Sequence, residues 1–169
     1  NSNYVVSQNT ELAEYQKINS SDKNQYELIK KLELSKNDFF ELKKYSDEIG
    51  IEFISTPFDE ESLKFLVEEL KVKKLKLSSC DLTNISLLWK AARYKLPLII
   101  STGMSTIEDI KIALSIIIHA RNEEKYPKDL NECKAKFSKY KSYIKSISNV
   151  TILHCTTSYP CPTEAINLN

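Results

Sequence analysis

Four short apolar runs in this chain are each followed by small hydroxyl side chains. The runs cover residues 51–54, 75–77, 97–100 and 151–154. Stretches with helical spacing separate the first three runs, so the pattern predicts alternating strands and helices, with parallel strands whose carboxyl ends meet on one side. Ligand sites of α/β proteins lie on that side. Ser and Thr are also common turn formers and helix caps, so each cluster by itself has a purely structural alternative.

Helix-start signals support the same alternation. A helical segment is predicted at about residues 25–34, and Gly50 is expected to end the helix that follows this segment. Further helices are predicted after the strands, because apolar residues recur there at helical spacing. The predicted helix starts are two capping boxes, Ser35 to Asp38 and Ser105 to Glu108, and the single caps Asp59 and either Asn84 or Ser86.

The pattern divides the chain into two predicted parts. Residues 1–34 are polar at their start and are expected to form an arm with one short helix. Residues 35–169 are expected to form a parallel α/β domain of about four strand–helix units. A charged loop and an inserted helix are predicted at about residues 121–149, because four apolar side chains align there: Phe137, Tyr140, Ile144 and Ile147. Since such a sheet would leave an apolar edge open, we expect further chain at one or both ends.

Charge and composition exclude several classes of protein. Lys and Arg total 24 against 23 Asp and Glu, in alternating order, which argues against a nucleic-acid partner. No run reaches the ~18 apolar residues of a membrane helix, and the chain does not start like a signal peptide. We therefore expect a cytoplasmic protein without a membrane segment. The four cysteines lack the spacing of a zinc site and are expected to be free thiols.

Lys76 is the most informative candidate for chemistry, because it lies inside an apolar strand just before Ser79. Successive strand residues point to opposite faces. If Lys76 faces away from the helices, its ammonium gives a fixed positive charge for a phosphate or carboxylate, with hydroxyls such as Ser101 as neutral donors. The alternative is a lysine whose stem packs on apolar surface while its charge reaches solvent.

Three other side chains near strand ends have both a chemical and a structural interpretation. His154 could be a base or a metal ligand, or a packed and hydrogen-bonded histidine. Asp81 is placed to orient a lysine or a substrate hydroxyl. Tyr159 could offer its ring and hydroxyl to a sugar, or could simply be packed.

At these residues the chain resembles the sialic acid synthase family. That family includes N-acetylneuraminate, legionaminate and pseudaminate synthases and their spore-coat polysaccharide relatives. Four blocks carry the resemblance in the same order: STPFD at 55–59, KLSSCDLTN at 76–84, STGM at 101–104 and HCTTSYP at 154–160, the last followed by Asn167 and Leu168.

The resemblance implies a parallel-stranded (β/α)8 TIM barrel. The implied reaction condenses phosphoenolpyruvate with an N-acylated mannosamine-type sugar, with a divalent metal (manganese or magnesium), to form a nine-carbon 2-keto sugar acid and phosphate. It also implies a homodimer. The roles implied for this chain are phosphoenolpyruvate binding by Thr56, Lys76, Ser79 and Ser101, sugar binding by Tyr159 and Thr157, and support by Asp81.

Departures from the family pattern limit this expectation. The chain resembles only the third to sixth strands, with residues 1–34 in the loop region after the second. The family's catalytic Glu and phosphate-binding Lys should precede Asn1 and its metal-binding histidines should follow Asn169, so the fragment alone is expected to be inactive. Cys80 stands where the family commonly has Gly and would be strained at a positive φ. The alternatives are a non-catalytic half-barrel binding module and another phosphoenolpyruvate-condensing or aldolase-type barrel enzyme.

Overall fold

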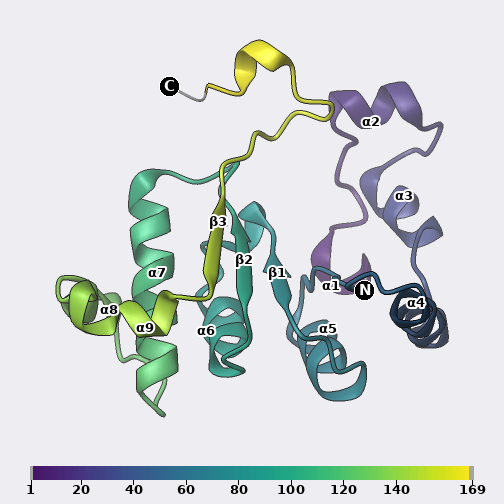
Figure 1. The fold of residues 1–169 in the computed structure, drawn as a ribbon. Helices are drawn as coiled ribbons and strands as arrows, with labels where there is room; N and C mark the ends of the chain where they lie inside the picture. Colours follow the sequence, from purple (N-terminus) through teal and green to yellow (C-terminus); the bar gives the residue numbers. More distant parts are fainter. Residues whose placement is uncertain (1, 168–169) are drawn as a thin grey trace. The chain divides into compact units, whose positions relative to one another are not determined.

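A computed structural model describes residues 2–167, with the burial of all of them except Tyr4 and Asn19 (Figure 1). The chain forms two compact units. The N-terminal unit contains Asn1–Phe53 and Ser158–Thr163, and the sheet unit contains Ile54–Thr157 and Glu164–Asn169. Each unit is described by itself. No helix in the described part of the chain is long and apolar enough to span a bilayer.

The sheet unit is built on three parallel strands in chain order, which confirms three of the four predicted strands. They are β1 (Leu75–Leu77), β2 (Leu98–Ser101) and β3 (Val150–Leu153). The register pairs Lys76 with Ile99 and Ile99 with Thr151. The parallel α/β class that the sequence predicts is therefore present.

The strand predicted at residues 51–54 is wrong for the described structure, because these residues pair with no strand. Ile51 and Ile54 are 61% and 39% exposed. A strand needs hydrogen-bonding partners for its backbone on a neighbouring strand, and an apolar pattern does not specify that neighbour. Residues 2–167 therefore show three paired strands rather than four, with α6 following β1 and α7 following β2.

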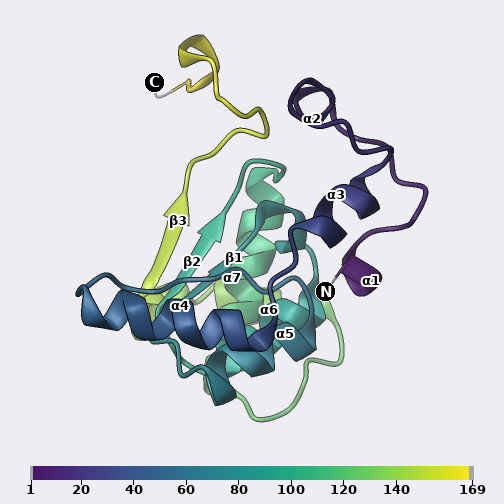
Figure 2. The same ribbon diagram turned by 90° about the vertical axis from the view of Figure 1, so that its right-hand side faces the viewer.

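Helices of the sheet unit lie on one side of the three strands (Figures 1 and 2). Leu75 and Leu77 of β1 and Leu98 and Ile100 of β2 are almost fully buried, so they face this helical layer. The helices of the unit are α5 (Glu60–Lys64), which continues as the π-helical turn η1 (Phe65–Glu69), then η2 (Ser79–Asp81), α6 (Ile85–Arg93), α7 (Ile107–Asn122), α8 (Leu130–Phe137), η3 (Tyr140–Tyr143) and α9 (Ile144–Ile147); a last turn, η4, spans Thr163–Ala165.

Side-chain caps begin α5 and α6 at Asp59 and Asn84, as predicted. The second capping box lies one residue later than predicted: the Thr106 hydroxyl accepts from the amide of Asp109 (3.2 Å), and the carboxylate of Asp109 accepts from the amide of Thr106 (2.8 Å). Two overlapping boxes fit the sequence here. The amide of Ser105 already donates to the carbonyl of Thr102 (3.0 Å) in a turn, so the helix begins after it.

The inserted segment is helical as predicted, but it is divided into three short helices rather than one. It consists of α8, η3 and α9, and α8 begins at an N-cap, Asp129, that the apolar pattern does not show. The helix ends at Ser138, whose amide bonds back to the carbonyl of Lys134 (3.0 Å). Phe137 and Tyr140 still stack, with ring centroids 6.0 Å apart.

The N-terminal unit contains four helices in its described part: α1 (Ser2–Val5), α2 (Glu14–Asn19), α3 (Gln25–Lys31) and α4 (Lys36–Glu48). The predicted α3 and α4 are confirmed, including the Ser35–Asp38 capping box and Gly50, whose φ of +75° ends α4. The arm predicted at residues 1–34 with one short helix holds α1 and α2 as well as α3, so the prediction is wrong in part. These helices are short, and sequence periodicity identifies helices of one or two turns poorly.

Candidate functional site

The carboxyl ends of the three strands form one edge of the sheet, where polar residues gather. Ser79 follows β1, Ser101 is the last residue of β2, and the segment at 154–157 follows β3. Because adjacent parallel strands end at the same edge, these segments lie next to one another. This edge is where α/β proteins usually bind ligands.

Lys76 points away from the helical layer. Its neighbours Leu75 and Leu77 are fully buried against the helices, and successive strand residues alternate between faces. Lys76 therefore lies on the open face, in one row with Ile99, and Ser101 follows Ile99 on the same face. An anion site at the strand ends requires that Lys76 does not point into the helical layer, and this requirement is met. Anion binding by Lys76 itself stays a prediction.

The turn η2 after β1 carries Ser79, Cys80 and Asp81. Cys80 is not among the residues with positive φ, so the strain considered for a non-glycine residue is absent. Its exposed thiol donates to the hydroxyl of Ser78 (3.2 Å). Partial burial raises the pKa of the Asp81 carboxyl, and bonds from Asn84 and Cys80 oppose that rise. The partners of Asp81 that the structure shows are these two residues rather than Lys76.

The loops after β2 and β3 touch each other. The hydroxyl of Thr102 donates to the carbonyl of Leu153, the last residue of β3, at 2.8 Å. A Cβ on Gly103 would lie 2.9 Å from the carbonyl oxygen of Thr156. Thr157, the predicted sugar contact, is exposed directly after this approach. The sequence does not predict these contacts of Thr102 and Gly103, although both residues belong to the STGM block at 101–104.

Two other predicted contacts belong to no strand. Thr56 is partly buried in the segment before α5, beside the buried Pro57. Tyr159 belongs to the N-terminal unit, where its ring is 63% exposed and lies 6.1 Å, centroid to centroid, from Tyr15 of α2. Thr56 and Thr157 belong to the sheet unit, so Tyr159 falls in a different unit from the other predicted site residues.

Comparison with known proteins decides the family. The profile of the NeuB family matches residues 1–169. The chain belongs to the NeuB family. This confirms the resemblance to sialic acid synthases seen in the sequence.

Relatives of this NeuB-family chain include two named synthases. It is 38% identical to the N,N'-diacetyllegionaminic acid synthase of Legionella pneumophila over 166 residues, which are 97% of this chain and 40% of that protein. It is 31% identical to the N-acetylneuraminate-9-phosphate synthase of Homo sapiens over 137 residues, 81% of this chain and 31% of that protein. The chain thus spans less than half the length of these relatives.

Solved structures of the family share the fold. A spore coat polysaccharide biosynthesis protein E from Chromobacterium violaceum superposes with a TM-score of 0.66 at 25% identity, over 93% of this chain and 38% of that one. An N-acetylneuraminic acid synthetase from Leptospira borgpetersenii, in complex with citrate, superposes with a TM-score of 0.56 at 25% identity, over 86% of this chain and 60% of that one.

Both histidines of the NeuB-family chain have backbone partners. His154 Nε2 lies 2.6 Å from the carbonyl of Ile166, and buried His119 Nε2 lies 3.1 Å from the carbonyl of Lys125. These contacts favour the structural interpretation of His154. Within residues 2–167 no three His, Cys, Asp or Glu side chains gather as a metal site would require. The four cysteines are free, as predicted.

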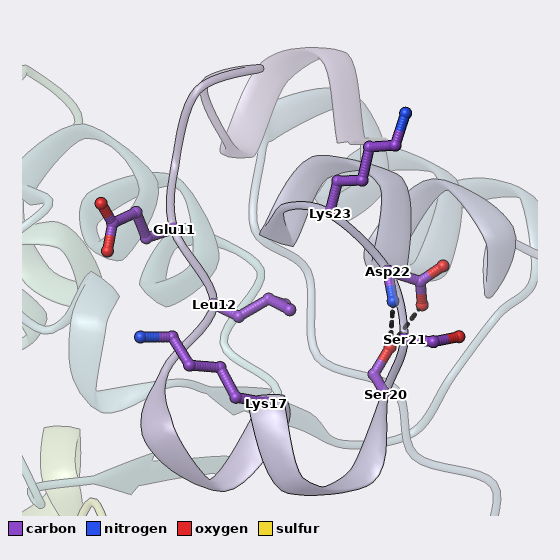
Figure 3. Close-up of a pocket in the computed structure, with 7 residues that line it drawn as sticks. All are labelled: Glu11, Leu12, Lys17, Ser20, Ser21, Asp22 and Lys23. Atoms are coloured by element: carbon purple, nitrogen blue, oxygen red, sulfur yellow. Dashed lines mark hydrogen bonds between the residues drawn. The ribbon is translucent and has the colours of Figure 1, made fainter.

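A pocket lies in the N-terminal unit (Figure 3). It has a volume of about 430 Å³, and the Leu12 side chain extends toward Ser20 and Asp22. The Ser20 hydroxyl donates to the carboxylate of Asp22 (2.6 Å) at its rim. None of its lining residues is one that the resemblance assigns: Glu11, Leu12, Lys17, Ser20, Ser21, Asp22 and Lys23. We therefore take the strand edge, rather than this pocket, as the candidate site.

Proposed function

We propose that the chain is the central part of a sialic-acid-type synthase that condenses phosphoenolpyruvate with an N-acylated mannosamine-type sugar. In this reaction C3 of phosphoenolpyruvate bonds to the aldehyde carbon of the sugar, water adds at C2, and phosphate leaves. The three strands would then be part of a (β/α)8 barrel whose interior is the open face of the sheet. NeuB family membership and the names of the two synthases above support this proposal.

One observation carries the proposal: Lys76 projects from the open face near the edge where the hydroxyls of Ser79 and Ser101 gather. A substrate with a phosphate and a carboxylate needs a positive charge together with hydrogen-bond donors. Lys76 would bind the anion, and Thr56, Ser79 and Ser101 would donate to its oxygens. Thr157 and Tyr159 would contact the sugar, while Asp81 would support the β1 end.

The divalent metal that the resemblance implies does not fit the described residues. Both histidines bond to carbonyl groups, and no cluster of ligands converges within residues 2–167. We therefore assign no residue of this chain to the metal and derive no step through it. The role of this chain in the reaction is to bind and orient the two substrates.

The test is Lys76→Ala in the complete synthase. Loss of a charge-assisted contact worth roughly 1.5–3 kcal/mol should raise the KM for phosphoenolpyruvate about 10- to 100-fold and change the KM for the sugar much less. Tyr159→Ala should do the reverse. Steady-state kinetics with each substrate varied in turn, in the presence of manganese, measures both constants.

The matched control is Lys73→Ala, which removes the same charge from an exposed position before β1. It should leave both KM values unchanged. Equal losses for the two substrates in Lys76→Ala would mean that the lysine only supports the fold. Absence of any condensation by the complete wild-type protein would refute the proposed function itself.

A further inference from the structure

Two contacts from the loop after β2 hold residues 153–156, the end of β3 and the start of the loop that follows it, at both ends. At one end, the Thr102 hydroxyl donates to the carbonyl of Leu153 at 2.8 Å. At the other end, Thr156 lies against Gly103, so closely that a Cβ there would stand 2.9 Å from its carbonyl oxygen. Heavy atoms essentially never approach a real Cβ this closely, so any other residue at position 103 would displace the segment.

The segment that follows β3, residues 154–157, is held by these contacts and ends at Thr157, the proposed sugar contact. The residue just before the clamp, Ser101, is held differently. It pairs with Leu153 in the parallel ladder and is almost fully buried, so its position depends on the sheet rather than on the Thr102 hydroxyl. The two sides of the proposed site meet at Leu153: the ladder holds it beside Ser101, while the Thr102 hydroxyl bonds its carbonyl and Gly103 contacts Thr156 after the strand has ended.

We propose that Thr102 and Gly103 are positioning residues that set the place of the sugar-side loop relative to the anion side of the site. This inference rests on the proposed function. Thr102 acts through the carbonyl of Leu153 and Gly103 through the backbone of Thr156, and neither has to touch a substrate. The Cys155 thiol also approaches the carbonyl of Leu153, at 3.3 Å, but a thiol is a weak donor and would replace the hydroxyl only in part.

The kinetic test compares Thr102→Val with Thr102→Ser in the complete synthase. Valine keeps the shape but loses the donor, so it should raise the KM for the sugar about threefold to tenfold while the KM for phosphoenolpyruvate stays within about twofold. Serine keeps the hydroxyl and should restore the wild-type KM. Gly103→Ala should shift the KM for the sugar in the same direction by a larger factor, because the carbonyl of Thr156 must move.

The control is Thr106→Val, which removes another threonine hydroxyl, the N-cap of α7, without touching the 154–157 segment. It should lower thermal stability but leave the KM for the sugar unchanged. If Thr102→Val raises both KM values equally, or leaves both unchanged, the positioning role is refuted.

A second measurement is independent of the reaction. Amide hydrogen exchange of residues 154–157 should become faster in Thr102→Val than in wild type and should be unchanged in Thr106→Val. Unchanged exchange in Thr102→Val would overturn the clamp even in an active enzyme. Faster exchange in a protein without condensation activity would support the clamp while refuting the proposed function.

Discussion

Helices α4 and α7 start with the same local signal and differ in what covers them. Each begins at a reciprocal capping box, Ser35 with Asp38 in α4 and Thr106 with Asp109 in α7. In α7 the described side chains include seven buried ones, whereas α4 has none. A capping box therefore specifies where a helix begins, and it says nothing about the surface on which the helix packs.

The same contrast separates the two units. In the described part of residues 1–53, Ser2 and Leu12 are the buried residues, whereas the sheet unit has a continuous apolar core between the sheet and its helices. Apolar side chains of α4 such as Leu42 and Tyr45 are 43% and 61% exposed. Since burial of apolar surface is the main stabilising term in folding, we expect the sheet unit to contribute most of the free energy of unfolding.

A matched pair of leucine substitutions should give the largest difference. Leu88→Ala removes a fully buried side chain from α6 and should lower the free energy of unfolding by about 2–5 kcal/mol. Leu42→Ala in half-exposed α4 should cost about 1 kcal/mol or less. Urea unfolding followed by circular dichroism measures both, and Trp89, the single tryptophan, reports on the sheet unit. If the two variants lose similar amounts of unfolding free energy, α4 is covered in the protein in solution.

Arg121 provides a second way to examine the sheet unit. Its guanidinium donates to the carbonyls of Leu96 (2.8 Å) and Ser146 (2.6 Å) and to the side chain of Asn149 (2.5 Å), just before β2 and β3 begin. Arg121→Ala should lower the free energy of unfolding by about 2–3 kcal/mol, because these partly buried carbonyls lose a charged donor. Arg121→Lys should recover only part of this, since an ammonium cannot reproduce the planar fork. The urea unfolding midpoints of the two variants measure these losses. A loss below about 0.5 kcal/mol in Arg121→Ala would contradict the stabilising role of the Arg121 hydrogen bonds.

The smallest expected effect is an acid-induced loosening within the N-terminal unit. The carboxylate of Glu33 accepts from the Ser2 amide and from Lys30 (3.0 Å), and these bonds lower its pKa from 4.5 to about 2. A carboxyl whose pKa falls on folding stabilises the fold fully above pH 4.5 and loses that contribution as the pH drops towards 2. The Ser2 amide resonance should follow this titration by NMR, and Glu33→Gln should abolish it. A midpoint near 4.5 would contradict the proposed bond.

The residues of the chain determined most of the local structure of the sheet unit. The strands at Leu75, Leu98 and Val150 follow from apolar runs bounded by turn residues. The caps at Asp59 and Asn84 follow from side-chain oxygens that accept a hydrogen bond from the backbone amide three residues later. Motif blocks also predicted the NeuB family, because their order and spacing are specific. These signals are local, so one sequence suffices to read them.

Tertiary structure decided what depends on a partner segment. Residues 51–54 have an apolar run like the others but pair with no strand. Helix α7 is capped by Thr106 rather than by Ser105, because the amide of Ser105 donates to a carbonyl within a turn. The open-face direction of Lys76 depends on which side the helices cover. The contact of Thr102 with Leu153, 51 residues away, exists only because β2 and β3 pair. Hydrogen bonds between distant segments form where the fold brings them together, and no local pattern encodes that meeting.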